Sequence, residues 1–364
     1  MGKETMFHRG CLLGLAAGDA LGHAVDDKNL EQIRQAYGQS GILGYDLQNY
    51  EWAEVTSYTQ LAAFTACGLL SAMTRGGEEQ YPQYLAAALR EWAECQKKRA
   101  APDRGLCWVA WIPALRRRVC MDTRMVELLS RRTLGTARKP VNDFNTPGAI
   151  AAAAAVGMFF APGRMEPPRI GTLGAQAVLM THGDPETFLA GALVAYAIAG
   201  ILQEPEAVLA EQFIQAAQAV RGQFGSRYPQ QTAALEGKIR KAISMVKHLE
   251  LEPEAVMEQF RCDTAAECVA GALYACLIHP GNFNEAVTVA VNHSGRSCAT
   301  GAVAGAIMGA RLGEEELKDF YLDPLEPLEA LRCLAEDLAK GRQANRIFDD
   351  SWDHKYIQGQ PVLE

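Results

Sequence analysis

The sequence predicts an all-α protein, a single compact multi-helix domain, and three observations support this prediction. Apolar residues recur with helical spacing along most of the 364 residues, and the alanine-rich stretches lack the alternation that strands show. Signals that start and stop helices recur along the chain. Two sets of glycines repeat every four residues, one near each end. We expect roughly a dozen or more helices and few or no strands.

The glycine sets predict two buried, tightly packed helices. They are Gly10, Gly14, Gly18 and Gly22 near the amino terminus, and Gly301, Gly305, Gly309 and Gly313 near the carboxyl terminus. A four-residue spacing places each set on one helix face. Each glycine costs a helix about 1 kcal/mol relative to alanine, so one set costs about 4 kcal/mol, which close backbone packing would offset. If the two helices pack on each other, the polar segments 19–27 and 292–298 meet at one site.

Start signals and apolar runs predict the other helices in order. Residues 57–60 fit a capping box, with Gln60 reaching back to the helix start, ahead of an apolar run at 61–73. The glycine pair at 76–77 ends this helix. Further apolar runs follow at 84–93, 149–160, 188–202 and 265–277.

The later helices carry their own signals. Residues 184–186, Asp-Pro-Glu, supply an N-cap, a first-turn proline and an acid, and residues 252–254, Glu-Pro-Glu, begin another helix. Stop signals are expected at Gly200 and at the Pro-Gly pair 280–281.

Composition bounds the class of protein. Of the residues, 49% are hydrophobic and 21% are charged, with a net charge of -8, which suits one large core. No basic stripe runs along the chain, so nucleic acid is not an expected partner. The longest apolar run, 149–160, is shorter than a membrane span. Asp19 interrupts the amino-terminal apolar stretch, so neither a membrane partner nor a signal peptide is expected.

Ten cysteines are scattered along the chain without a C-x-x-C pair. This pattern predicts reduced, buried thiols of a cytoplasmic protein rather than a disulfide framework or a zinc site. No Gly/Ser-rich or charged linker divides the chain. We therefore expect one domain over residues 1–348 and a carboxyl-terminal tail, 349–364, that packs loosely or meets a partner chain. The sequence leaves the oligomeric state open.

Polar residues stand where several predicted helices begin or end. Asp19 lies inside the first glycine helix, where pairing with a neighbouring helix is favoured over a catalytic role because a buried acid needs partners. Asp26 follows the end of that helix and is the candidate catalytic acid. Thr56, Ser57 and Tyr58 stand at the start of the next long helix and are candidate ligand-binding residues. Capping explains Ser57 equally well, and ring packing explains Tyr58.

The segment with the clearest candidate binding residues precedes the second glycine helix. The candidate ligand-binding residues there are Asn292, His293, Ser294, Gly295, Arg296 and Cys298. A helix amino terminus carries unpaired N–H groups and a partial positive charge, to which Arg296 adds a full charge. This end therefore predicts an anion pocket, with phosphate as the obvious ligand. The alternative is that Arg296 pairs with an internal acid, Asp19 or Asp26.

Two histidines lie near these helix ends. His182 precedes an apolar helix and is a candidate ligand-binding residue. The favoured alternative is a structural role, in which its ring is held by hydrogen bonds within the protein. His293 and Cys298 are conceivable as a base and its nucleophile, but no acid is placed to orient them, so this pair is disfavoured.

Taken in order, these segments resemble the ADP-ribosylglycohydrolase family, which includes the dinitrogenase-reductase-activating glycohydrolases. Residues 10–22, GCLLGLAAGDALG, are similar to that family's first helix. Residues 181–185, THGDP, are similar to an internal segment, and residues 290–305, AVNHSGRSCATGAVAG, to its closing motif. The similarity spans most of the chain. It implies a compact all-α domain with its site in a cleft between helix ends.

The departures from the family pattern bear on function. The resemblance implies two Mg²⁺ ions held by a T/S-D-D-T motif and a closing G-G-D-x-D-T motif. Here residues 56–59 read T-S-Y-T and residues 294–299 read S-G-R-S-C-A. Thr56 keeps a ligand oxygen, and Asp26 falls where the family usually has Glu. Because hard divalent ions need carboxylate oxygens, we expect no metal cofactor. The Arg296 guanidinium would then do part of the anion neutralisation that a metal would do.

Three hypotheses follow. The leading one is a remodelled, metal-free site that binds ADP-ribose or a related nucleotide, or a protein carrying one, with weak or no hydrolysis. The second is an active hydrolase in which Asp26 is the general base and Arg296 stabilises developing charge. The third is a structural or interaction protein that keeps only the scaffold.

Overall fold

A computed structural model of the protein describes residues 2–47, 51–98, 105–119, 123–131, 134–161, 163, 166–341 and 350–361. Every regular element in these ranges is a helix. The isolated bridges, Ala53 with Leu325 and Thr136 with Lys139, build no sheet there. The all-α prediction is confirmed.

The helices follow one another along the described chain as α1 (Lys3–His23), α2 (Leu30–Tyr37), α3 (Ser57–Arg75), α4 (Tyr81–Lys98), α5 (Pro113–Arg116), α6 (Thr123–Leu129), α7 (Ile150–Phe160), α8 (Pro167–Leu179), α9 (Pro185–Gln203), α10 (Leu209–Phe224), α11 (Pro229–Met245), α12 (Pro253–Phe260), α13 (Ala265–Ile278), α14 (Phe283–Val291), α15 (Ser297–Leu312), α16 (Asp319–Leu322), α17 (Leu328–Lys340) and α18 (Ser351–Asp353). Short turns of other helix types are η1 (Glu78–Gln80), η2 (Trp108–Trp111), η3 (Glu314–Glu316) and η4 (His354–Gln358).

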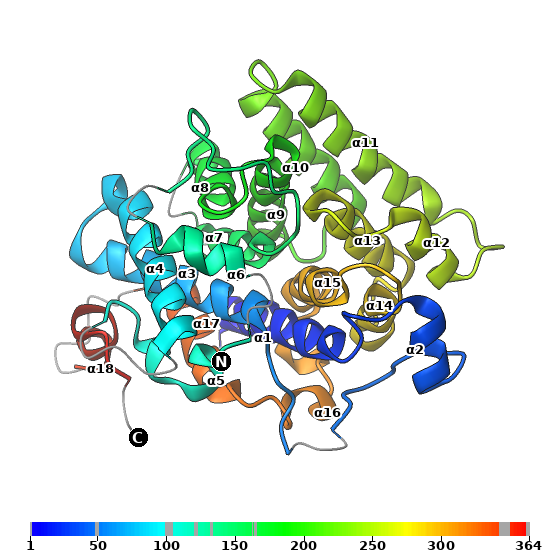
Figure 1. Ribbon diagram of the computed structural model, residues 1–364, viewed down its shortest axis with the longest axis horizontal. Helices are drawn as coiled ribbons and strands as arrows, with labels where there is room; N and C mark the ends of the chain where they lie inside the picture. The colour runs from blue at the N-terminus through cyan, green and yellow to red at the C-terminus, as the bar shows by residue number, and fades with distance from the viewer. Residues whose placement is uncertain are drawn as a thin grey trace.

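The pairing of α1 with α15 lies at the centre of the fold (Figure 1). The two helices run antiparallel, and the glycine ridge of one faces that of the other. A Cβ atom added at Gly18 would overlap the carbonyl oxygen of Gly301, and one added at Gly305 would overlap that of Gly14. Such contact brings many backbone atoms within van der Waals distance, which offsets the helix cost of the glycines. The predicted packing of the two helices on each other is confirmed.

Other helices enclose this pair on several sides. α13 and α14 pack against α15, whereas α17 packs against α1. α7 is buried along its whole length and contacts α3, α8 and α9. The central helices α1 and α15 are therefore apolar around most of their circumference, as expected for helices inside a large core.

α9 begins as predicted, because Asp184 is its N-cap and Pro185 its first residue. The predicted stop at Gly200 is wrong, since the helix continues to Gln203. An interior glycine costs a helix only about 1 kcal/mol, which the packing of α9 on α7 and α8 outweighs. Its length and mean hydropathy of 1.6 would suffice to cross a membrane, so 149–160 is not the longest apolar stretch. In the fold, 72% of that stretch of α9 is buried, as in a core helix.

The capping box predicted at the start of α3 is wrong. Thr56, not Ser57, is the N-cap residue. The Gln60 side chain does not turn back to the helix start: its Nε2 donates to the carbonyl of Ala114 at 2.9 Å, and its Oε1 accepts from Trp92 Nε1 at 2.9 Å. Gln60 is fully buried, and its amide satisfies polar groups of neighbouring segments that would otherwise lack partners.

The described part of the tail, 350–361, packs into the domain, which corrects the expectation of loose packing. Tyr356 is fully buried, and its carbonyl accepts from Arg75 Nε at 2.7 Å. Trp352 Nε1 donates to Thr74 Oγ1 at 3.0 Å. The tail therefore covers the carboxyl end of α3. The expected domain boundary after residue 348 lies outside the described residues and stays a prediction.

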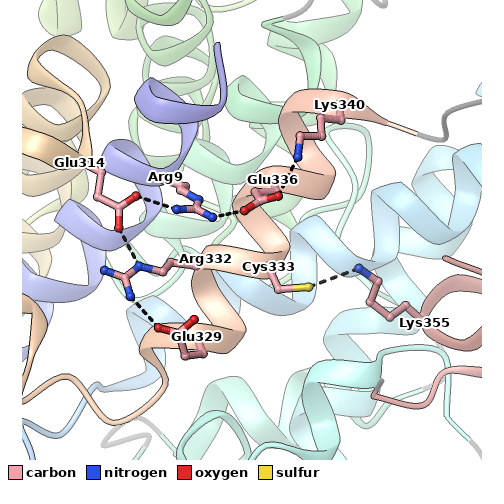
Figure 2. A network of polar contacts seen from close by, with 8 residues as sticks. All are labelled: Arg9, Glu314, Glu329, Arg332, Cys333, Glu336, Lys340 and Lys355. Carbon is pink, nitrogen blue, oxygen red and sulfur yellow. Dashed lines mark hydrogen bonds and ion pairs between the residues drawn. The ribbon is translucent and has the colours of Figure 1, made fainter. Parts of the chain in front are cut away.

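A network of ion pairs joins α1, η3 and α17 (Figure 2). Arg9 donates to Glu314 at 3.2 Å and also pairs with Glu336. Arg332 donates to the other Glu314 oxygen at 2.6 Å. Because several charges share these partners in a half-buried place, the network holds η3 and α17 against the amino-terminal half of α1 more firmly than an isolated surface pair would.

Gly18→Ala is expected to lower the free energy of unfolding by at least about 2 kcal/mol, because the new methyl group has no room against α15. Gly237→Ala in α11 is the matched control. Gly237 is exposed and an added Cβ meets no atom within 4 Å, so this change should be neutral or stabilising by up to about 1 kcal/mol. The measurement is urea unfolding of both variants, and equal stabilities would contradict the close packing of α1 on α15.

Candidate functional site

The antiparallel packing brings three helix ends to one place. Gly22, in the last turn of α1, faces Ser297, the first residue of α15. The start of α3 lies beside the same end of α1, because Asp19 binds the backbone of Thr56 there. The predicted meeting of the polar helix ends is thus found. We call the following set the helix-end cluster: Asp26, Thr56, Ser57, Tyr58, Arg296 and Cys298.

Asp19 anchors the start of α3. It is fully buried, and its Oδ1 accepts the Thr56 hydroxyl at 2.6 Å. Its Oδ2 accepts the backbone N–H of Thr56 at 2.8 Å and of Thr59 at 3.1 Å, and also the Thr59 hydroxyl at 2.6 Å. Burial raises the pKa of Asp19, and these hydrogen bonds oppose the rise. Asp19 therefore positions α3, the helix-bridging role that the sequence favours.

Asp26 lies in the turn after α1 and reaches the amino end of α15. Its Oδ1 accepts the backbone N–H of Cys298 at 2.8 Å, and its Oδ2 lies 4.0 Å from Nη1 of Arg296. A carboxylate at a helix amino end satisfies an unpaired N–H group and is favoured by the helix dipole. Asp26 thus fills part of the predicted anion pocket. The acid nearest to Arg296 is Asp26 rather than Asp19.

Burial also sets the protonation of this part of the site. It raises the pKa of Asp26 above its usual value, whereas the Cys298 N–H and the Arg296 charge lower it. Burial and the nearby Asp26 carboxyl raise the pKa of the Tyr58 phenol and of the Cys298 thiol well above their usual values. Both groups are therefore neutral at neutral pH, and a neutral thiol is a poor nucleophile.

Asn292 and His293 hold the loop before α15. Asn292 accepts from the backbone N–H of Ile42 and donates to the carbonyl of Ile42, both at 2.9 Å. His293 Nδ1 accepts from the N–H of Gly295 at 2.9 Å, and its Nε2 donates to the carbonyl of Ala290 at 2.9 Å. Both ring nitrogens of His293 are thus engaged, so the disfavoured pair with Cys298 is not formed. Contact of Asn292 or His293 with a ligand stays a prediction.

Ser294 and Gly295 join this loop to its neighbours. The Ser294 hydroxyl accepts from the N–H of Leu30 and donates to Glu258, each at 3.0 Å, and so links α2 to α12. A Cβ atom added at Gly295 would overlap the carbonyl oxygen of Arg261. Gly295 is therefore required for the close approach of a neighbouring protein segment, and contact of Gly295 with a ligand stays a prediction.

A turn at Arg261 and Cys262, which the sequence did not indicate, holds the backbone of Arg296. Arg261 and Cys262 have positive φ angles of 65° and 54°, uncommon for residues other than glycine. The Cys262 carbonyl accepts the backbone N–H of Arg296 at 2.9 Å. No glycine or asparagine marks this turn, so sequence reasoning had no local signal for it.

His182 holds the loop that precedes α7. Its Nδ1 lies 2.8 Å from the Thr181 hydroxyl and its Nε2 lies 3.0 Å from the Thr146 hydroxyl. Asn142 donates to the Thr181 carbonyl at 2.8 Å, which fastens the same loop a second time. This geometry matches the structural, hydrogen-bonded role for His182, and contact of His182 with a ligand stays a prediction.

A hollow of about 390 Å³ opens beside the end of α1, lined there by Ala20 and Ala24. Its aromatic and charged lining residues are His23, Lys28, Tyr37, Tyr45, Asp46, Trp52 and Glu54. The members of the helix-end cluster do not line it. The hollow and the cluster are therefore neighbours at the end of one helix rather than parts of one pocket.

The donor groups near the helix ends are mixed. Within the described residues, no group of three or more histidine, cysteine or carboxylate side chains is placed to hold a metal ion. In the helix-end cluster, Asp26 supplies the carboxylate, Arg296 a positive charge, and Ser57 and Tyr58 hydroxyl groups, whereas the Thr56 hydroxyl already donates to Asp19. This set can bind an anion through Arg296 and donate hydrogen bonds to it.

Burial lowers the pKa of His293 from 6.5 to about 4. Because the unfolded chain then binds a proton at higher pH than the folded one, the contribution of His293 to the free energy of unfolding is complete above about pH 6.5 and is lost as pH falls toward 4. The shift corresponds to about 3 kcal/mol. Urea unfolding across this range should show the loss in the wild type. His293→Gln should remove this contribution to the slope of the unfolding free energy against pH, whereas His248→Gln, at an exposed position, should keep it. Equal slopes in both variants would contradict the assignment.

Comparison with known proteins confirms the resemblance seen in the motifs. The sequence model of the ADP-ribosylglycohydrolase family matches residues 8–347. An uncharacterized protein of Archaeoglobus fulgidus is 24% identical over 337 residues, which are 91% of this chain and 95% of that protein. A solved structure described as an ADP-ribosylglycohydrolase-related protein complex shares the fold, with a TM-score of 0.64 and 20% identity over 93% of this chain and 99% of its own. The family match extends over nearly the whole chain, and the chain therefore belongs to the ADP-ribosylglycohydrolase family.

Proposed function

We propose that this protein binds ADP-ribose, or a related nucleotide that is free or attached to a protein, at the helix-end cluster, with little or no hydrolysis. The observation that carries the proposal is the position of Arg296. It is the N-cap residue of α15, and its side chain is 52% exposed where three helix ends meet. A guanidinium at a helix amino end suits a phosphate or pyrophosphate. Family membership favours an ADP-ribosyl group as the source of that phosphate.

Asp26 leaves Arg296 able to accept such a ligand. The carboxylate takes the Cys298 N–H, and its distance of 4.0 Å from Arg296 is too long for a hydrogen bond. A phosphate could bind the guanidinium through two hydrogen bonds, which is a stronger contact than this loose pair. The Cys262 carbonyl fixes the backbone of Arg296, so less conformational freedom is lost on binding.

The neighbouring hollow favours a nucleotide over a simple anion. Tyr37, Tyr45 and Trp52 line it, and Trp52 is 50% exposed. An exposed aromatic face can stack on a base. Because the hollow and the helix-end cluster share the end of α1, a ligand with its phosphate at Arg296 could extend its base toward the hollow.

The donor set does not fit the two Mg²⁺ ions that the family motifs imply. The acid positions of those motifs are occupied by Ser57, Tyr58, Arg296 and Cys298. Magnesium takes hard oxygen ligands, whereas a guanidinium repels it and a neutral thiol binds it poorly. Asp26 is already bonded to the Cys298 N–H. We therefore derive no step through a metal ion.

The proposed setting is the cytoplasm, which the free state of the described cysteines supports. The proposed partners are the nucleotide itself or a protein modified with ADP-ribose. The net charge of -8 argues against nucleic acid and against an anionic membrane surface.

ADP-ribose added in the presence of EDTA is expected to raise the melting temperature and to give a binding isotherm by calorimetry. Arg296→Ala should weaken the affinity about 10-fold or more, because a hydrogen bond to a charged group is worth about 1.5–3 kcal/mol. Arg240→Ala, which removes an exposed arginine on α11, is the control and should leave the affinity unchanged. Absence of binding at millimolar ADP-ribose would contradict the proposal and favour a protein that keeps only the scaffold.

A second candidate is hydrolysis without a metal ion, because an acid with a raised pKa, such as Asp26, is suited to proton transfer nearer neutral pH. We expect no or slow release of ADP-ribose from an ADP-ribosylated arginine peptide in EDTA. Release that Asp26→Asn abolishes and Asp27→Asn keeps would establish this second candidate instead; Asp27 is the exposed neighbour. Release that requires Mg²⁺ and stops on chelation would contradict the metal-free site.

A further inference from the structure

Cys333 and Lys355 form a close pair where the tail meets the domain (Figure 2). Cys333 lies on α17 and Lys355 lies in η4, with 3.2 Å between Nζ and Sγ. Among the free cysteines of the described chain, Cys333 is partly exposed and the other eight are buried. Of these described thiols, Cys333 is therefore the most accessible to an oxidant from solvent.

The surroundings hold Lys355 against the sulfur. Its side chain is only 8% exposed, and its Nζ also donates to Asp337, which accepts the Tyr356 hydroxyl at 2.6 Å. The centroid of the Trp108 ring lies 6.0 Å from the Lys355 Nζ. A further charge on α17, Glu336, is occupied by Arg9 and Lys340. The amine thus has one fixed position, with a proton acceptor on one side and a sulfur atom on the other.

The resting pair is stable without an oxidant. Burial works to lower the pKa of Lys355, but Asp337 outweighs it, so the amine is an ammonium. Burial and Asp337 raise the pKa of the Cys333 thiol. A neutral thiol oxidises more slowly than a thiolate, so the reaction described next needs time and an added oxidant.

We propose that Cys333 and Lys355 are an oxidative modification site, at which a peroxide joins the two side chains through a sulfur–nitrogen bond. Two observations carry this proposal: the 3.2 Å contact between the two reacting atoms, and the Asp337 carboxylate bonded to the same nitrogen. The product is a sulfenamide that links α17 to the tail.

The reaction balances in two steps. In the first, peroxide transfers one oxygen to the Cys333 thiol, which gives a sulfenic acid, and the peroxide is reduced to water. In the second, Lys355 gives one proton to Asp337 and its nitrogen lone pair attacks the sulfur. The sulfur–oxygen bond breaks, and the leaving hydroxide takes a second proton from the nitrogen and departs as water. Sulfenic acids condense with a backbone nitrogen to a sulfenamide, and the amine of Lys355 takes the place of that nitrogen here. One peroxide is consumed, two waters form, and the joined side chains have lost two hydrogens.

The bond would fasten the tail onto the domain. The tail already contacts the carboxyl end of α3 through Arg75 and Thr74. A cross-link closes a loop between Cys333 and Lys355, which restricts the unfolded chain and so stabilises the folded one. A higher melting temperature should therefore accompany the modification.

The test uses the full-length protein, treated with hydrogen peroxide under native conditions, alkylated, digested and analysed by tandem mass spectrometry. We expect one peptide pair joined between Cys333 and Lys355 that lacks two hydrogens, together with a raised melting temperature. Dithiothreitol should reverse both. Treatment in urea, where the side chains are apart, should give no joined pair. Cys333 that is recovered only as thiol, sulfenic acid or sulfinic acid after native treatment would overturn the proposal.

Three variants sharpen this test. Cys333→Ser exchanges one atom, preserves the packing, and should abolish the joined peptide. Lys355→Arg keeps a positive charge beside Asp337 but lacks the amine, so Cys333 should stop at its oxygenated forms. Lys340→Arg changes an exposed lysine of the same helix and should leave the joined peptide intact. A joined peptide that survives Lys355→Arg, or that disappears in Lys340→Arg, would overturn the assignment.

Discussion

The backbone contact between α1 and α15 is the constraint on which the rest of the structure depends. Without side chains on the facing ridges, the carbonyl oxygens of one helix lie where a Cβ atom of the other would be. This approach fixes the register of the two helices, and their antiparallel direction places the end of α1 beside the start of α15. Asp19, on the same helix, then holds the start of α3 through Thr56 and Thr59. A bulkier ridge would separate all three helix ends and disperse the polar groups that they carry.

At these helix ends the protein supplies its own positive charge. Arg296 and the amino end of α15 are both positive, and Asp26 balances only part of this charge because it lies 4.0 Å from the guanidinium. The resemblance to the family motifs implies acids at these positions that hold magnesium instead. Either arrangement would bring positive charge to the anion that we propose binds here. Only a metal ion, however, also activates a water molecule as a nucleophile, which is the physical reason for placing binding ahead of hydrolysis here.

The sequence predicted the features that depend on local pattern. Glycine spacing indicated two packed helices, and the Asp-Pro-Glu segment located the start of α9. Two of the wrong predictions have a common cause. Gln60 was expected to cap its own helix, yet it bonds to Trp92 on another helix. Gly200 was expected to end α9, yet packing on neighbouring helices carries the helix past it. In each case a tertiary contact outweighed a local preference of about 1 kcal/mol.

By itself, the sequence determined the helical class, the two glycine faces, and which residue types stand at each helix end, because periodicity and capping act within a few residues. Only the tertiary structure decided that Asp26 rather than Asp19 lies beside Arg296, and that His293 turns its ring nitrogens to the backbone. It also decided that Cys333 lies next to Lys355. These contacts depend on the direction of each side chain and on the register of packed helices, and no short-range pattern encodes either.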